Sequence, residues 1–382
     1  MRDENLIRKT IFKNELYFIF EKNNVCKAEE QKIVFSIFEN PLEISKQYIL
    51  KEEFSKLEAL DRKLNQIIDN KELVGAIKTL FIVQEDLKLP SEISKLFLKN
   101  EKVAIFVGAG ISKLIGFPLW DELANKAIEY LHKQNLITYF EYQKIMREVS
   151  DPKQKMTIFD ALIPRYRKEA RNFYTEIFSK PNYKNGNPYE ILIEFDCLKI
   201  TTNVDKEFYN ALDKKLRTKE LQERAKMIEI QNLNINNINN NAIYHIHGSI
   251  DKLEQTVLTT KDYIEAYYID KSPVRTFLSD VFREYTVIFV GYGLSEFPIL
   301  EHIIGKENYH YALIPSYLNE INLFKLQQKY FENLHIKPIP FFLDFNGYNR
   351  LVDVLDSWIQ QLSEQRQKDY YQKIRIIDEV ID

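Results

Sequence analysis

Four short polar or glycine-rich clusters follow four apolar runs of the sequence, and residues of these types could together bind a nucleotide and move a proton. The clusters are Gly108–Ser112, Thr202–Asp205, His247–Ser249 and Gly291–Ser295. Glycine after a strand lets backbone N–H groups approach a phosphate closely, and a histidine at a strand end can transfer a proton. If the runs are strands of one parallel sheet, the clusters meet outside its carboxyl edge, where α/β proteins bind ligands.

Each cluster also has a plainer interpretation. The first glycine pair could form only a tight turn, because Lys113 stands where the dinucleotide-binding fingerprint has its third glycine and there is no Gly-Lys-Ser/Thr phosphate loop. Asn203 and Asp205, two positions apart after a strand, could share one face or, with Thr202, cap a helix. The clusters indicate a site only as a set.

The histidines do not indicate a metal site. His245 and His247 alternate along a strand, but a zinc site needs three or four ligands and no other His, Cys or Glu cluster is spaced to complete one. We therefore predict no metal, and His247 is either structural or a proton-transfer residue. Of the other charged residues, Glu296 and Asp121 are loose candidates for the site, but a place at the surface or in a cap is expected for each. Solvent is the expected partner of a charged helical face that holds Arg165, Arg167 and Arg171.

The second glycine turn has the same pattern as the first, an apolar run followed by Gly-x-Gly. Gly291, Tyr292, Gly293 and Ser295 follow another short apolar run. Two strand–Gly-x-Gly turns in one sheet suggest that two halves of a nucleotide are held on opposite sides.

Short apolar runs alternate with helical patterns, which predicts an α/β fold. The expected architecture is a Rossmann-like, mostly parallel sheet flanked by helices. Its strands are predicted over residues 103–107, 197–201, 242–247, 286–290, 311–315 and 336–342, with a possible short one over 256–260.

The segments between these strands complete the predicted organisation. We expect an N-terminal accessory or interface segment over residues 1–95, a catalytic domain over 96–365 and a C-terminal tail over 366–382. The domain would contain a helical insertion over about 120–190. Helical periodicity predicts helices over residues 93–98, 157–178, 205–230 and 351–362. Seven asparagines in eleven positions predict a loop over residues 231–241.

Composition excludes several classes of protein. The 382 residues include 53 Lys+Arg and 56 Asp+Glu, for a net charge of −3, so no strong direct nucleic-acid binding is expected. The two cysteines, Cys26 and Cys197, cannot build a disulfide framework or a four-cysteine zinc ribbon and are expected to be buried thiols. The sequence has neither a membrane-length apolar run nor a secretion signal, which predicts a cytoplasmic protein.

Taken in order, the clusters resemble the sirtuin-like NAD-binding family, and most closely its bacterial antiphage branch, which destroys NAD. The resemblance runs from about residue 102 to 362. The motifs that carry it are Val107-Gly108-Ala109-Gly110-Ile111-Ser112, Gly116-Phe117-Pro118, Thr202-Asn203-Val204-Asp205, His247-Gly248, Leu258-Thr259-Thr260-Lys261-Asp262-Tyr263 and Phe289-Val290-Gly291-Tyr292-Gly293-Leu294-Ser295.

The departures from that family weaken a deacylase function. Deacylase sirtuins carry a four-cysteine zinc ribbon, and Trp120-Asp121 stands where they have Phe-Arg. NAD binding is left intact by both changes.

The resemblance implies an NAD+ hydrolase that releases nicotinamide and ADP-ribose and acts in antiphage defence by NAD depletion, with NAD as substrate and no zinc. It implies that Asn203 holds the nicotinamide end or the attacking water, that Asp205 orients nicotinamide or stabilises charge, and that His247 bonds the ribose hydroxyls or acts as base. Gly108, Ala109 and Gly110 would offer backbone N–H groups to the pyrophosphate. Ser112, Gly291 and Ser295 would hold the adenosine half, and Tyr292 and Gly293 belong to the same cofactor-binding turn.

Other functions stay open. One is an NAD-dependent deacylase or ADP-ribosyl transferase, and another is a non-catalytic subunit that senses NAD or ADP-ribose. Because constant NAD consumption would poison the cell, we expect restraint through a homo-oligomer or a partner. The resemblance points to a HerA-type hexameric DNA-translocase ATPase as that partner.

Overall fold

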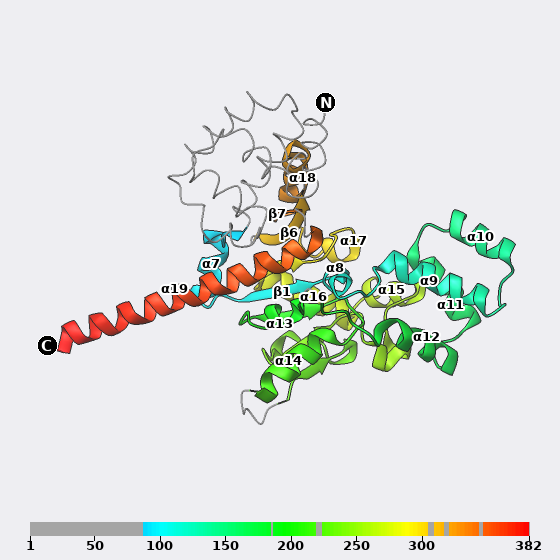
Figure 1. Ribbon diagram of the computed structural model, residues 1–382, viewed down its shortest axis with the longest axis horizontal. Helices are drawn as coiled ribbons and strands as arrows, with labels where there is room; N and C mark the ends of the chain where they lie inside the picture. Colours follow the sequence, from blue (N-terminus) through cyan, green and yellow to red (C-terminus); the bar gives the residue numbers. More distant parts are fainter. Residues whose placement is uncertain are drawn as a thin grey trace, which may run out of the picture. The chain divides into compact units, whose positions relative to one another are not determined.

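The computed structural model describes residues 87–184, 186–218, 224–304, 309–316, 321–343 and 347–381 (Figure 1). Almost all of the accessory segment expected over residues 1–95, including Cys26, therefore lies outside the described residues. Contacts group Leu89–Ser316 and Glu320–Asp382 into one compact unit, which holds the sheet and the predicted site. The predicted division into three segments stays a prediction.

A parallel sheet forms the centre of the unit and confirms the predicted α/β, Rossmann-like fold. Its seven described strands run in the order β3-β4-β2-β1-β5-β6-β7, and every neighbouring pair is parallel. The strands are β1 (Val103–Val107), β2 (Leu198–Thr201), β3 (Lys226–Ile228), β4 (Ala242–His245), β5 (Thr286–Val290), β6 (His310–Ser316) and β7 (Ile336–Phe342). All five residues of β1 are buried, as expected of a strand covered on both faces.

Helices occupy most of the connections between these strands. They are α7 (Ser91–Leu98), α8 (Ala109–Leu114), α9 (Trp120–Lys133), α10 (Tyr139–Glu148), α11 (Pro152–Leu162), α12 (Lys168–Phe178), α13 (Pro188–Leu192), α14 (Glu207–Thr218), α15 (Thr260–Tyr267), α16 (Pro273–Glu284), α17 (Phe297–Leu300), α18 (Ile321–Asn333) and α19 (Arg350–Ile381). Helices α11, α13 and α16 each begin with a capping side chain followed by proline, the usual start signal of a helix.

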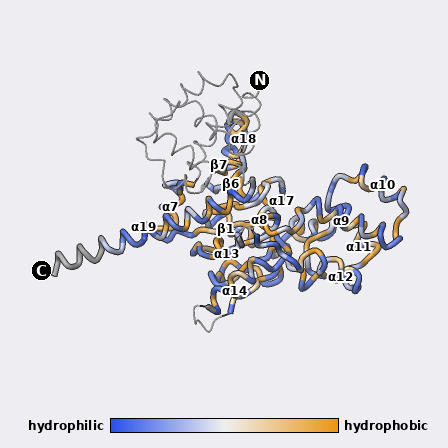
Figure 2. The backbone as a smooth tube through the Cα atoms, in the orientation of Figure 1, coloured by the Kyte–Doolittle hydropathy of each residue, from blue (hydrophilic) through white to orange (hydrophobic). Residues whose placement is uncertain are grey.

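Four of the predicted elements differ from the structure. Residues 256–260 form no strand, because the Thr259 side chain caps α15. The helix expected over 205–230 ends at Thr218, and β3 follows it. The helix expected over 157–178 is two helices, since Pro164 disfavours helical backbone at Ile163. Helix α19 runs through the expected tail to Ile381. Residues 363–371 of this helix are mostly exposed, and Figure 2 shows this part of the helix as hydrophilic.

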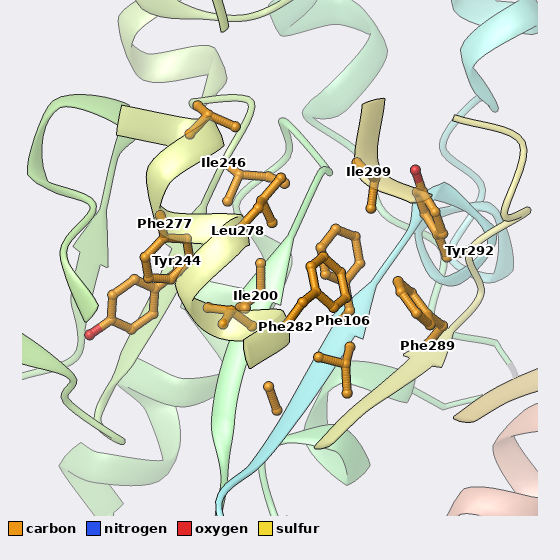
Figure 3. Packing of buried hydrophobic residues seen from close by; sticks show 14 of the residues in the cluster. Phe106, Ile200, Tyr244, Ile246, Phe277, Leu278, Phe282, Phe289, Tyr292 and Ile299 are labelled. Carbon is orange, nitrogen blue, oxygen red and sulfur yellow. The ribbon is translucent and has the colours of Figure 1, made fainter. Parts of the chain in front are cut away.

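The main core lies between one face of the sheet and helices α15 to α17 (Figure 3). Phe106 of β1 packs against Phe289 of β5 and Tyr292 just beyond it, with both pairs of ring centroids 5.2 Å apart. Tyr244 of β4 stacks on Phe277 of α16 at 5.4 Å. Outside this cluster, helix α19 contacts α7, α13 and β7.

The strand order places the site. The chain moves from β1 to one side through β2 and β4, and then returns to the other side with β5. Strands β1 and β5 are paired from Val103↔Thr286 to Val107↔Val290, so they end together. This reversal is a topological switch point, where open α/β sheets form a ligand crevice.

Candidate functional site

The two glycine turns interlock at the switch point. The Gly108 N–H donates to the Val290 carbonyl at 3.0 Å, and the Gly110 N–H donates to the Gly291 carbonyl at 2.8 Å. A Cβ on Gly108 would lie 2.6 Å from the Gly291 oxygen, and a Cβ on Gly110 would lie 2.7 Å from it. Both N–H groups are thus used by the opposite turn, and the glycines are needed for the close approach of the two turns. Contact of residues 108–110 with a pyrophosphate stays a prediction.

A hydrogen-bonded network connects the first two predicted clusters. The Asn203 amide nitrogen donates to the Gly108 carbonyl at 3.0 Å and to the Tyr189 hydroxyl at 2.9 Å. The Tyr189 hydroxyl is also 2.9 Å from Ser112 Oγ, which donates to Asp205 Oδ2 at 2.6 Å. Because both amide donors of Asn203 are used by the protein, the amide oxygen is the atom that can serve a ligand.

Asp205 is a buried carboxyl group. Burial raises its pKa to about 6, against the opposing effects of the Ser112 hydroxyl and the Glu207 N–H, which donates to Oδ1 at 3.0 Å. Such a group changes its charge close to neutral pH, whereas an exposed aspartate does so near 4.

The two histidines have different places. His247 Nε2 lies 2.5 Å from the Tyr267 hydroxyl, and burial, with a smaller effect of Lys153, lowers its pKa to about 3. His245 is fully buried, its Nδ1 lies 3.0 Å from the Asn203 carbonyl, and burial lowers its pKa to about 4. Both rings are therefore neutral at pH 7. His245 supports the backbone of Asn203, and His247 faces a cavity.

Two adjoining cavities bring most of the predicted residues together. The smaller has a volume of about 60 Å³, and Asn203, Asp205, His247 and Ser112 are among the residues that line it. The larger, of about 770 Å³, is lined by Ala109, Gly110, Gly291, Tyr292, Gly293 and Ser295 among others. The cavities share the walls formed by Ala109, Trp120, Thr202, Tyr263 and Glu296.

Ser112 lies at a different place from the one expected. The resemblance groups it with Gly291 and Ser295 as a contact of the adenosine half. In the structure its hydroxyl is bonded to Asp205 and lines the small cavity, whereas Gly291 and Ser295 line the large one.

Several residues at the cavities carry no clear signal in the sequence. Tyr189 comes from the helical insertion, and its only signal is the Asn187 cap that starts its helix. Tyr263 ends one of the quoted motifs, and its ring lies 5.4 Å from that of His247. The sequence offers Glu296 only as a loose candidate, with a place at the surface or in a cap expected. Glu296 does occupy the position before α17, but it also lines both cavities, whereas Asp121 is exposed at the edge of the large one.

Arg165 does not face solvent as expected. Its side chain is 14% exposed, pairs with Asp160 at 3.2 Å and with Asp262 at 2.9 Å, and donates to the Thr256 carbonyl at 2.6 Å. Burial alone would raise the pKa of Asp262, but Arg165 and the backbone N–H groups of Thr259 and Leu258 outweigh it, and the pKa lies below its usual value. Arg165 thus connects the helical insertion to α15, which carries Tyr263 and Tyr267.

Replacing Arg165 with alanine is expected to lower the free energy of unfolding by about 2–3 kcal/mol, somewhat less than for a fully buried pair, because Asp262 is left without its partner. Arg171→Ala is the matched control. Arg171 is 61% exposed and pairs with Glu254 at the surface, so its loss should cost at most about 0.5 kcal/mol. Urea denaturation of both variants measures the difference, and equal midpoints would contradict a structural role for Arg165.

Among the described residues, no group of three or more His, Cys, Asp or Glu side chains is placed to hold a metal ion. Within the same residues, no helix is both long and apolar enough to span a membrane. Cys197 is a buried free thiol, as predicted, and burial raises its pKa to about 11.

Comparisons with known proteins give a family match and several distant relatives. Residues 198–339 match the family described as SIR2-like domain. The chain is 24% identical over 238 residues to the NAD(+) hydrolase ThsA of Enterococcus faecium, and the aligned region covers 58% of this chain and 45% of that protein. It is 23% identical over 242 residues to the NAD(+) hydrolase ThsA of Bacillus cereus (strain MSX-D12), covering 58% and 46%.

A third relative, Defense-associated sirtuin 2 of Bacillus subtilis, is 27% identical over 210 residues, or 53% of this chain and 19% of that protein. The chain thus spans less than half the length of each of these relatives. Together the matches confirm the predicted sirtuin-like resemblance.

Proposed function

Because residues 198–339 match the family described as SIR2-like domain, we propose that the chain is an NAD+ glycohydrolase that releases nicotinamide and ADP-ribose. One observation carries the proposal: Asn203, Asp205 and His247 line one small cavity, which shares its walls with a large cavity beside both glycine turns. A volume of about 770 Å³ lies in the range of roughly 300–1,000 Å³ that is usual for small-molecule sites. The names of two relatives as NAD(+) hydrolases support the same activity.

The residues of the small cavity suit the chemistry. Nicotinamide is a cationic leaving group that departs without a proton, so the site must stabilise an oxocarbenium-like ribose and position water. Asp205 supplies negative charge, and the amide oxygen of Asn203 can hold water or the nicotinamide amide. His247 is neutral, with its Nε2 paired to Tyr267, so we assign it a hydrogen bond to a ribose hydroxyl in place of a base role.

The assay that tests the activity is incubation of the purified chain with NAD+ alone. We expect equal amounts of nicotinamide and ADP-ribose, separated by chromatography. Turnover only in the presence of an acyl-lysine peptide or a protein acceptor would favour a deacylase or transferase, and binding without turnover would favour a sensing subunit. Repeating the assay over a range of protein concentrations tests whether an oligomer controls the rate.

A role in antiphage defence by NAD depletion is part of the proposal, supported by the name of the Bacillus subtilis relative. The homo-oligomer and the HerA-type partner stay predictions from the resemblance.

The rim of the large cavity suits the adenine base. Phe297 and Tyr268 line this cavity and are 63% and 53% exposed, which leaves their rings open for stacking. Because stacking of a base on an aromatic ring is worth about 1–3 kcal/mol, Phe297→Ala is expected to raise KM for NAD+ about 10–100-fold with little change in kcat. Phe140→Ala on α10, whose ring is 75% exposed and outside both cavities, is the control. An unchanged KM in Phe297→Ala would place the adenine elsewhere.

A further inference from the structure

Glu296 is a carboxylate on the wall between the two cavities. It lies at the position before α17, just beyond the second glycine turn, and it lines both the small and the large cavity. Its Oε2 accepts a hydrogen bond from the Tyr263 hydroxyl at 3.4 Å. The same Tyr263 ring packs against His247, so Glu296 borders the space where the proposed reaction takes place.

Hydrolysis needs a group that takes a proton from water, and the other candidates at the small cavity are poorly suited to it. His247 has its Nε2 paired to Tyr267, and a group whose pKa is about 3 is a weak base. Asp205 has one oxygen bonded to Ser112 and the other to the Glu207 N–H. Asp121 is exposed and lines only the large cavity.

We propose that Glu296 is a further catalytic residue, the general base of the hydrolysis. The inference rests on the proposed NAD+ glycohydrolase activity. The bond between ribose C1′ and the nicotinamide nitrogen breaks, and its electron pair stays on nicotinamide, which leaves neutral. The oxygen of water bonds to C1′, and the proton of that water passes to the Glu296 carboxylate and then to solvent.

The surroundings of Glu296 favour this role. Burial raises its pKa above the usual value, while the Lys153 cation and the hydroxyls of Tyr263 and Tyr292 act in the opposite direction. Tyr267 of α15 also senses its charge. A base is most effective when its pKa lies near the working pH, so a carboxylate shifted upward is better suited than an ordinary one.

The test is Glu296→Gln, which keeps the size of the side chain and removes its basicity. We expect kcat for NAD+ hydrolysis to fall about 10²–10⁴-fold, as for loss of a general base, with KM changed less than about threefold. Sodium azide is an anionic nucleophile that gives up no proton, so it should restore nicotinamide release in this variant and yield ADP-ribosyl azide. Glu265→Gln, at an exposed position on α15 outside both cavities, should behave as the unchanged chain does.

A second variant covers a failure of Glu296→Gln to fold. Glu296→Asp keeps a carboxylate, so it should retain partial activity and a rate that rises with pH as that carboxylate ionises. Near-normal activity of Glu296→Gln, or a folded variant without azide rescue, would overturn the role of Glu296 while hydrolysis by the unchanged chain still stands. Absence of hydrolysis by the unchanged chain would instead overturn the proposed function, and the inference with it.

Discussion

Replacing Asn203 with alanine is expected to slow nicotinamide release by about 10²–10³-fold, the usual effect of removing one preorganised polar group from a reaction site. The amide is held by the Gly108 carbonyl and the Tyr189 hydroxyl, so its oxygen has a fixed place in the wall of the small cavity. A fixed dipole acts on charge that develops in the transition state without first having to reorient. Steady-state assay of nicotinamide release at saturating NAD+ measures the loss.

Tyr189→Phe is the matched control for this variant. It removes the hydroxyl that accepts from Asn203 at 2.9 Å but keeps the amide itself and the stacking on Phe208. We expect it to cost about 1–3 kcal/mol in stability, because buried polar groups lose a partner, and far less in rate than Asn203→Ala. Full activity of both Asn203→Ala and His247→Ala would show that the reaction does not take place in this cavity.

Gly108→Ala is expected to destabilise the fold at the switch point and to weaken NAD+ binding. The added Cβ would lie 2.6 Å from the Gly291 oxygen and 2.7 Å from Tyr292 Cα, and these backbone atoms cannot give way without separating the two turns. Overpacking of this kind typically costs about 1–3 kcal/mol. The midpoint of urea unfolding should fall accordingly, and affinity for NAD+ should fall with it, because the displaced turns border the large cavity.

Gly293 in the second turn provides the comparison. A Cβ there would meet only Ser295 Oγ, at 3.9 Å, so Gly293→Ala should change the free energy of unfolding by no more than about 0.5 kcal/mol. If both alanine variants unfold at the same urea concentration, the close approach of the turns is not what requires glycine at position 108.

The buried strands could be predicted from the sequence because their signal is local. Val103–Val107 and Thr286–Val290 are short, almost wholly apolar runs next to glycine, and the structure has both as strands with those bounds. Strand β3 has only three residues, none of them buried and Lys226 exposed, so no apolar run marks it. Arg165 was misplaced for a similar reason, since helical periodicity cannot identify a partner 97 positions away.

The candidate site was predictable in part. Asn203, Asp205 and His247 each follow a strand, so the parallel topology alone predicts that they meet, and they line one cavity. The place of Tyr189 depends on how a helix of the insertion packs against Asn203, and that of Glu296 depends on how a short loop packs against Tyr263. No local sequence pattern predicts either contact. Likewise, the sequence shows that the glycines are needed but not that their N–H groups are used by the opposite turn.

The buried carboxyl group of Asp205 lowers the stability of the native state at neutral pH. Its folded-state pKa of about 6 lies above the ordinary 3.8, so the native chain holds its proton more tightly than the unfolded chain does. By linkage, this group's contribution to stability is present below pH 3.8 and is lost as the pH rises through about 6. At neutral pH the native state thus carries a buried anion, whose hydrogen-bond partners among the described residues are the Ser112 hydroxyl and the Glu207 N–H. In the proposed reaction a pyridinium ring beside Asp205 would lower the cost of burying that charge, and this benefit would end when nicotinamide leaves uncharged.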